Sequence, residues 1–248
     1  MKRTHLKQFS LTLGAIFGAI SLTLAPASAL QATTDARSTE PKSTEKSGTP
    51  KLIITRGDNE INRRLNSLKE LSKKVNAAEK LSASDKSTLS SEVNDETSNL
   101  TSLKTKLDAD TDESTAKTDT QSIITNYRVY ALVLPKVNLV KSADDQLTAE
   151  TKLTTLAAKL QSRLTAAQHD GKAVTSLQNT LTDLTNKTAA AQAISTSVRA
   201  NVIGLQPSDY NNAHTVLNGD WKQLKTAQGD IQAAINDAQT IISGLKNL

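Results

Sequence analysis

The chain has 248 residues, 30 Lys and Arg against 25 Asp and Glu, a formal net charge of +5, no cysteine and 2% aromatic residues. The lack of cysteine excludes disulfide bonds, thiol catalysis and structural cysteine–zinc sites. So few aromatic residues exclude a base-stacking platform or an aromatic sugar cleft, and they leave Leu, Ile, Val and Ala to form a core of packed helices.

Residues 1–29 are expected to be a cleaved signal peptide. Lys2, Arg3 and Lys7 precede the apolar segment 11–25, and residues 27–29 read Ala-Ser-Ala. This order of charge, apolar run and small residues is what signal peptidase recognises, and the run is short for a membrane span. An uncleaved anchor is the alternative. Cleavage removes three basic residues and no acid, so the charge falls from +5 to +2. The mature chain therefore lacks the charge of a nucleic-acid binder.

Residues 30–57 are expected to be a disordered linker. The part up to residue 50 is rich in Ser, Thr, Lys, Glu and Pro and almost free of large apolar residues. Ordering such a segment would bury too little apolar surface to offset the loss of conformational entropy.

Residues 58–141 are expected to form a unit of three helices. Asp58 is placed to cap the first helix, and Ser82 and Asp85 to form a capping box for the second. The apolar residues recur at helical spacing. The expected core residues are Ile61, Leu65, Leu68, Leu71, Val75, Leu89, Val93, Leu100, Leu103 and Leu107.

Residues 142–248 are expected to form a second unit of three helices, with Gly171 and Gly204 ending the first two. The first of these helices is expected to bury four leucines at spacings of three and four: Leu153, Leu156, Leu160 and Leu164. Apolar residues keep a strict alternation of three and four steps, which is typical of coiled-coil packing. The seam predicted for the last helix is Tyr210, His214, Leu217, Trp221, Leu224, Gln228, Ile231, Ile235, Ala238, Ile242 and Leu245. The predicted fold class is all-α, an elongated antiparallel bundle or coiled coil.

The segment 127–145, YRVYALVLPKVNLVKSADD, contains two of the chain's three tyrosines, a six-residue apolar run and a proline. On a helix the run 129–134 is apolar on all sides, which predicts a buried core with a kink or break at Pro135. A β-strand and an exposed partner-binding patch are the alternatives. If a partner or ligand surface exists, its expected residues are Tyr127, Tyr130, Pro135, Tyr210 and Trp221.

Several segments resemble an uncharacterised family of secreted bacterial helical proteins. The similarity is carried by RGDNEINRRLNSL, KLSASDKSTLSSEVNDETSNLTSLKTKLDADTD, QSIITNYRVYALVLPKVNLVKSADD and LQPSDYNNAHTVLNGDWKQLKTAQGDIQAAINDAQTII. It covers most of residues 56–245, and the YRVY-LPK-AD block is its most distinctive part. The chain departs from the family at Gln206, where relatives have a better capping residue before the proline. The resemblance implies export and a helical fold, and it implies no activity.

The acidic turn 108–119 has oxygen ligands at alternate positions of a calcium loop. Asp108, Asp110 and Asp112 occupy positions 1, 3 and 5, and Asp119 occupies position 12. Glu113 stands where calcium loops have glycine. A solvated turn, with Asp112 capping the next helix, is the alternative to calcium binding.

No nucleophile elbow, glycine-rich phosphate loop or histidine pair at metal spacing occurs in the sequence. The sequence therefore favours an exported, non-enzymatic scaffold or binding protein at the bacterial cell envelope. Its partner would be an unidentified protein, an envelope component or a second copy of the chain, with no nucleic acid and no membrane span after cleavage. The alternative is a secreted bundle that binds a ligand or calcium.

Overall fold

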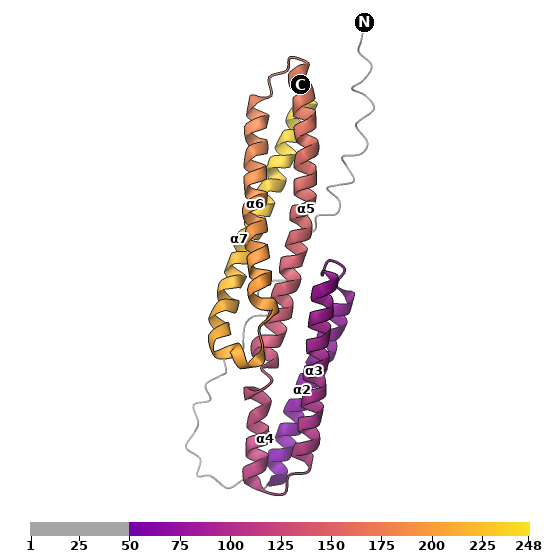
Figure 1. The fold of residues 1–248 in the computed structure, drawn as a ribbon, viewed down its shortest axis with the longest axis vertical. Helices are drawn as coiled ribbons and strands as arrows, with labels where there is room; N and C mark the ends of the chain where they lie inside the picture. The colour runs from indigo at the N-terminus through magenta and orange to yellow at the C-terminus, as the bar shows by residue number, and fades with distance from the viewer. Residues whose placement is uncertain (1–49) are drawn as a thin grey trace. The chain divides into compact units, whose positions relative to one another are not determined.

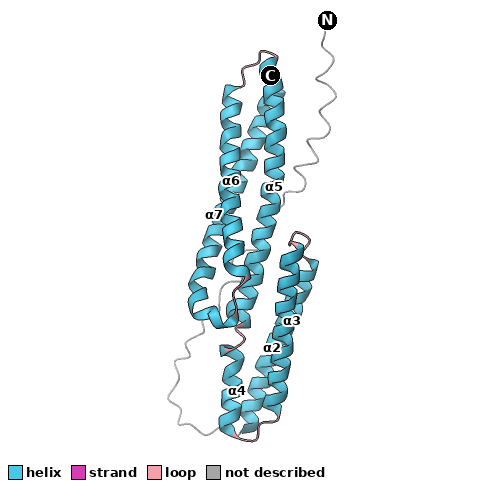
Figure 2. Cartoon of the chain, in the orientation of Figure 1, coloured by secondary structure: helices cyan, strands magenta, loops and turns pink. Residues whose placement is uncertain are grey.

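The computed structural model describes residues 50–248, which are helical nearly throughout and contain no strand (Figures 1 and 2). The elements in chain order are α2 (Pro50–Ala77), α3 (Ala83–Asp108), α4 (Glu113–Thr125), the π-helical turn η2 (Val129–Val133), α5 (Leu134–His169), α6 (Thr175–Ile203), the 3-10 turn η3 (Pro207–Asp209) and α7 (Tyr210–Lys246). The all-α class is confirmed. The expected signal 1–29 and most of the expected linker lie outside the described residues.

The first described helix begins earlier than we expected. It starts at Pro50, where the missing N–H of proline is tolerated in a first turn. Asp58 is therefore not a cap: it lies within α2, and its carboxylate accepts a hydrogen bond of 2.8 Å from Lys104 Nζ on α3. Residues 50–57, which were expected to belong to the linker, are therefore helical.

The described residues divide into two compact units that are not continuous in sequence. Unit 1 contains residues 145–195 and 225–248, and unit 2 contains residues 50–144 and 196–224. The sequence suggested consecutive ranges, 58–141 and 142–248. The observed units differ from these mainly because residues 196–224 group with the N-terminal helices.

The core of unit 1 is made of aliphatic side chains on α5, α6 and α7. On α5 it contains the four leucines predicted at spacings of three and four, all of them fully buried: Leu153, Leu156, Leu160 and Leu164. Helix α5 ends as expected, since Gly171 adopts a left-handed φ of 75°. The amide of Lys172 reaches back to the carbonyl of Ala167 over 3.0 Å, which satisfies one of the last carbonyls of the helix.

The buried face of α7 is rotated by one residue from the predicted seam. Leu217, Leu224, Ile231 and Ala238 are buried as predicted. The alternate positions of the buried face are Ala213, Asp220, Ala227, Ala234 and Ile241 instead of His214, Trp221, Gln228, Ile235 and Ile242. Three of the five are alanines, which let neighbouring helices approach closely and leave the polar groups of His214 and Gln228 outside the buried face. Asp220 is the exception, because its carboxylate is buried.

Unit 2 contains a fully buried cation. Lys136 on α5 has no exposed surface, and its Nζ donates to Glu92 Oε2 on α3 at 2.5 Å and to the Leu205 carbonyl at 2.8 Å. Burial raises the pKa of Glu92, while the hydrogen bond from Lys136 lowers it. A buried charge is tolerated only when it is paired and hydrogen-bonded, so this contact joins three segments that are distant in the sequence.

A second charged cluster in unit 2 joins the same helices. Arg199 on α6 forms ion pairs with Asp85 on α3 and, at 3.3 Å, with Asp144 on α5. Ser82 caps α3 as predicted, because its hydroxyl accepts a 3.0 Å hydrogen bond from the Asp85 amide. The reciprocal half of the capping box is absent: the Ser82 amide donates to Asp144 Oδ2 at 2.8 Å.

We predict opposite effects for two glycine-to-alanine substitutions. A Cβ at Gly57 would lie 2.5 Å from Leu107 Cδ2 and 2.9 Å from Thr120 Oγ1, whereas a Cβ at Gly229 would meet nothing within 4 Å. Gly57→Ala should lower the free energy of unfolding by about 1–3 kcal/mol because it overpacks the core. Gly229→Ala should raise it by about 1 kcal/mol through helix propensity. Urea denaturation measures both, and stabilisation by Gly57→Ala would contradict the packing described here.

We also predict that Lys136→Met lowers the free energy of unfolding by about 3–5 kcal/mol, since it leaves Glu92 desolvated without its cation. The double variant Lys136→Met/Glu92→Leu should recover most of this loss. Urea denaturation of the two single variants and the double variant forms a complete mutant cycle. Equal losses in Lys136→Met and in the double variant would show that the ion pair is not the source of the effect.

Candidate functional site

The segment between α4 and α5 contains the least regular backbone of unit 2. Arg128 has a left-handed φ of 46°, which is uncommon for a residue with a side chain. The amides of Leu132 and Val133 both donate to the Arg128 carbonyl, at 2.8 and 3.3 Å, and so form the wide π-helical turn. Such turns are rare and are frequent at functional sites. The break expected at Pro135 is therefore found just before it, and the proline lies in the first turn of α5.

The apolar side chains of this turn are buried, as predicted. Val129, Leu132 and Val133 are fully buried and hold the unusual backbone in place. Tyr130 points outward from the same turn and is 37% exposed. The strand alternative for this segment is excluded, while one aromatic side chain remains available at the surface.

Tyr130 is held against α2 by two arginines and a serine. The guanidinium carbons of Arg63 and Arg64 lie 5.5 and 5.1 Å from the centroid of its ring. Its hydroxyl lies 3.0 Å from Ser67 Oγ. Cation–π contacts of this kind contribute about 0.5–2 kcal/mol each, so the ring is fixed in one orientation although it is partly exposed.

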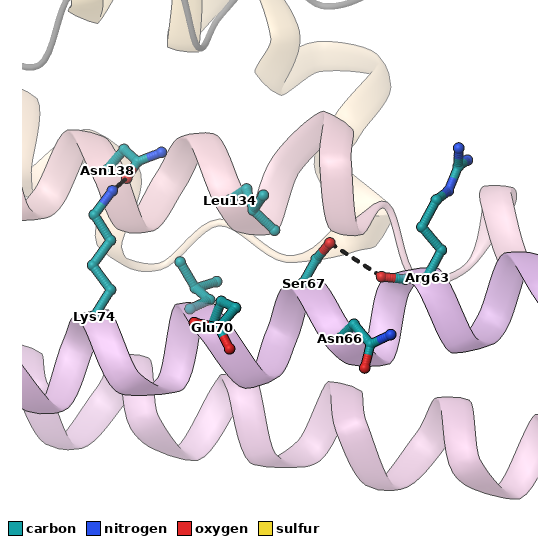
Figure 3. A pocket seen from close by; sticks show the side chains of 8 residues that line it. Arg63, Asn66, Ser67, Glu70, Lys74, Leu134 and Asn138 are labelled. Atoms are coloured by element: carbon teal, nitrogen blue, oxygen red, sulfur yellow. Dashed lines mark hydrogen bonds between the residues drawn. The ribbon is translucent and has the colours of Figure 1, made fainter.

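A groove of about 470 Å³ lies between α2 and the first turns of α5 (Figure 3). Ser67, which contacts the Tyr130 hydroxyl, is one of its lining residues. Its apolar part is formed by Leu71 and Leu134, and the remaining side chains are polar. Lys74 Nζ crosses the groove and donates to Asn138 Oδ1 at 2.6 Å. The lining residues are Arg63, Asn66, Ser67, Glu70, Leu71, Lys74, Leu134 and Asn138.

The groove lies on the most basic helix of unit 2. Glu70 is paired with Lys73 at 2.7 Å, and this hydrogen bond lowers the pKa of Glu70. The pKa of Lys74 is lowered by burial and then by the positive charge of Lys141. Cations outnumber acids along α2: Lys51, Arg56, Arg63, Arg64, Lys69, Lys73 and Lys74 stand against Asp58, Glu60 and Glu70.

The five residues of the predicted partner surface do not form one site. Tyr130 and Pro135 lie next to the groove. Tyr210 packs elsewhere, with the Arg128 guanidinium 4.6 Å from its ring centroid and the His214 ring at 5.8 Å.

The other two members of the predicted surface are partly buried. The Tyr127 hydroxyl donates to the Asn99 carbonyl at 3.4 Å, and Trp221 Nε1 is buried with no hydrogen-bond partner in the described part of the chain. The groove residues of α2 were missed by sequence reasoning. The one available signal was the excess of Lys and Arg between residues 56 and 74.

The four carboxylates of the predicted calcium loop have separate surroundings. Asp108 pairs with Lys104 at 3.0 Å, and Asp119 pairs with Lys106 at 2.8 Å. Asp112 caps α4 by accepting a 2.8 Å hydrogen bond from the Thr115 amide. No group of three or more His, Cys, Asp or Glu side chains within residues 50–248 is close enough to hold a metal ion.

Asp110 and Asp119 of this turn share one property, an unsatisfied carboxylate oxygen. Each has a buried Oδ2 with no hydrogen-bond partner among the described residues. Burial raises the pKa of Asp110, and the charge of Asp119 raises it further. The two carboxylates are therefore electrostatically linked.

A buried glutamate lies in α3 near Tyr127. Glu96 is 8% exposed, and its Oε2 has no hydrogen-bond partner in residues 50–248. Burial raises its pKa to about 7, and the charges of Glu92 and Asp95 contribute in the same direction. No pattern in the sequence distinguishes Glu96, because it occupies an ordinary core position of a helix.

Comparisons with known proteins identify no relative of this chain: no family model, no curated protein and no solved structure matches it. The resemblance to a family of secreted bacterial helical proteins therefore remains a prediction. None of the helices within residues 50–248 is both long enough and apolar enough to cross a membrane.

We predict that Glu96→Gln raises stability at alkaline pH. Since the folded-state pKa is raised to about 7, the stabilising proton is bound below the unfolded-state value of 4.5 and is lost as the pH rises through 7. The variant should be more stable than the parent by about 1–3 kcal/mol at pH 8 and nearly equal to it at pH 4.5. Urea denaturation at both pH values measures this, with the exposed Glu79→Gln as the control. A variant with the same pH dependence as the parent would refute the assignment.

Proposed function

We propose that this chain is an exported, non-enzymatic helical binding protein that acts at the bacterial cell envelope through contacts of its helix surface. The observation that carries the proposal is the groove between α2 and α5. Its lining combines a small apolar floor with amide, hydroxyl and charged groups that can form hydrogen bonds. These are the properties of a surface that recognises a partner.

The groove is largely formed before any partner binds. Ser67 donates to the Arg63 carbonyl at 3.1 Å, and Lys74 is already in contact with Asn138. Tyr130 is fixed by its two arginines at one end. Side chains that are ordered in advance lose less entropy on association, so even a shallow groove can bind a partner specifically.

The spacing of the buried residues also supports coiled-coil packing of the long helices, which would make the remainder of the chain a scaffold. On α6 the buried residues recur in alternating steps of three and four: Leu181, Leu184, Thr188, Ala191, Ser195, Val198 and Val202. The same alternation holds on α7. A regular seam of this kind is typical of left-handed packing of adjacent helices.

Export and partner binding can be tested together in the producing cell. A photo-crosslinking amino acid is placed at Asn66, which lines the groove, and in a control protein at Thr101, which is exposed on α3. We expect the mature chain to begin near residue 30 and to fractionate with the envelope. Irradiation should give a discrete adduct only from position 66, and Asn138→Trp should abolish it by filling the groove.

Two results would contradict the proposal. A chain that still begins at Met1 would contradict the cleaved signal. The same adducts from positions 66 and 101, or an adduct that survives Asn138→Trp, would show that the groove is not the binding surface. Mass spectrometry of the adduct distinguishes a second copy of the chain from another envelope protein.

A further inference from the structure

The core of unit 1 contains a carboxyl group that no cation neutralises. Glu150 on α5 is fully buried, as are Gln146, one turn earlier on the same helix, and Ser195 on α6. Ser195 Oγ lies 2.8 Å from Glu150 Oε1 and 3.1 Å from Gln146 Oε1. The second carboxyl oxygen, Glu150 Oε2, is buried with no hydrogen-bond partner in the described residues. The proposed groove lies in unit 2, so this cluster is separate from it.

The number of hydrogens in the cluster favours a protonated glutamic acid. A serine hydroxyl has one hydrogen, and an ionised carboxylate can only accept. With Glu150 ionised and the Gln146 amide oxygen facing Ser195, the Ser195 hydrogen can serve only one of its two oxygen neighbours. In any arrangement of the ionised cluster, Glu150 Oε2 remains a buried charged atom without a donor. With Glu150 protonated, its hydroxyl donates to Ser195, and Ser195 donates to Gln146. Both short contacts then contain a hydrogen.

The helices around the cluster offer no charge that could stabilise the ionised form. The charged side chains of unit 1 nearest in sequence to the cluster are Asp145 and Lys152 on α5 and Lys187 on α6, and all three are partly exposed. None of them contributes to the pKa of Glu150, and neither do the charged side chains of unit 1 on α7: Lys225, Asp230, Asp237 and Lys246. The other buried side chains of unit 1 are apolar apart from Thr188. Thr188 donates to the Leu184 carbonyl of its own helix.

We propose that Glu150, Ser195 and Gln146 form a proton-binding site in the core of unit 1, and that loss of this proton loosens the packing of α5 against α6. The device goes beyond partner binding, because it makes the order of one unit depend on the pH outside the cell. A buried carboxylate that loses its proton must either remain unsolvated or expose itself to water, and exposure requires the two helices to separate.

The direction of the effect follows from the buried acid. Burial raises the pKa of Glu150 to about 7, and the Ser195 hydrogen bond only partly opposes this change. A raised carboxyl pKa means that the folded unit holds its proton where the opened unit has lost it. The stabilisation is therefore complete below the ordinary value of 4.5 and is lost as the pH rises to about 7. Opening of unit 1 should become more frequent by roughly tenfold per pH unit across this interval.

Amide hydrogen exchange of the full mature chain tests the proposal. Exchange is followed by mass spectrometry in peptides covering residues 146–153 and 188–198, at pH 4.5 and pH 7.5, and is corrected for the intrinsic pH dependence. We expect the corrected opening of both peptides to increase on the order of 100-fold between the two values. Glu150→Gln keeps the size of the side chain and cannot lose a proton, so it should remove this increase.

Two further measurements make the result decisive. Glu96→Gln alters the buried glutamate of unit 2 and should leave the increase in unit 1 intact. A ¹³C NMR titration of the parent protein follows the Glu150 carboxyl directly and does not depend on any variant. An increase that persists in Glu150→Gln, an increase removed equally by Glu96→Gln, or a carboxyl that titrates near 4.5 would overturn the proposal.

Discussion

The arrangement of unit 2 depends on one buried ammonium group. Lys136 has no access to water, so its Nζ must find acceptors inside the protein, and it finds them on α3 and just beyond the end of α6. The acceptor beyond α6, the Leu205 carbonyl, follows a helix C-terminus, where the partial charge is negative and favours a cation. Segments more than forty residues apart in the chain are therefore brought together by the need to solvate a single charge. Hydrophobic packing alone has no such directional requirement, since the burial of apolar surface is non-directional.

This constraint also determines the groove. Lys136 faces the interior. Leu134 precedes it by two residues and Asn138 follows it by two residues, so both lie on a different face of α5. There they line the groove together with residues of α2. The π-helical turn before α5 contributes to the same result. Its extra residue changes the rotation with which the chain enters α5, and the buried Val129, Leu132 and Val133 hold that rotation. The surface that we propose for partner binding therefore depends on the same orientation of α5 that lets Lys136 reach its acceptors in the core.

The sequence predicts those parts of the fold that depend on local periodicity. The leucines of α5, the glycine after it and the cap at Ser82 were predicted because each signal lies within one helix or turn. The rotation of α7 was not predicted, because Ala213 and His214 both continue a four-three pattern. Only the packing of neighbouring helices selects the smaller residue.

The residues of the groove were missed for a related reason. Its residues come from two segments that are far apart in the chain, and polar residues such as Asn66 and Asn138 have no periodic signal at all. Ion pairs such as Arg199 with Asp85 could not be found either, since any lysine or arginine could pair with any acid.

The buried glutamates of the two units are satisfied in two different ways, either by a cation or by a retained proton, and this difference sets a common requirement on pH. In unit 2, Glu92 must be ionised to accept from Lys136, and burial moves its pKa above the ordinary value. In unit 1, Glu150 must keep its proton, which it does below about pH 7. Glu96 in unit 2 also has a pKa raised to about 7, so it too keeps its proton only below about that pH. Acidic conditions that protonate Glu92 therefore weaken the Lys136 contact, whereas alkaline conditions ionise two buried glutamates. Both units are fully satisfied only in an interval between these limits, and an exported chain would meet such changes directly because no cytoplasmic buffer protects it.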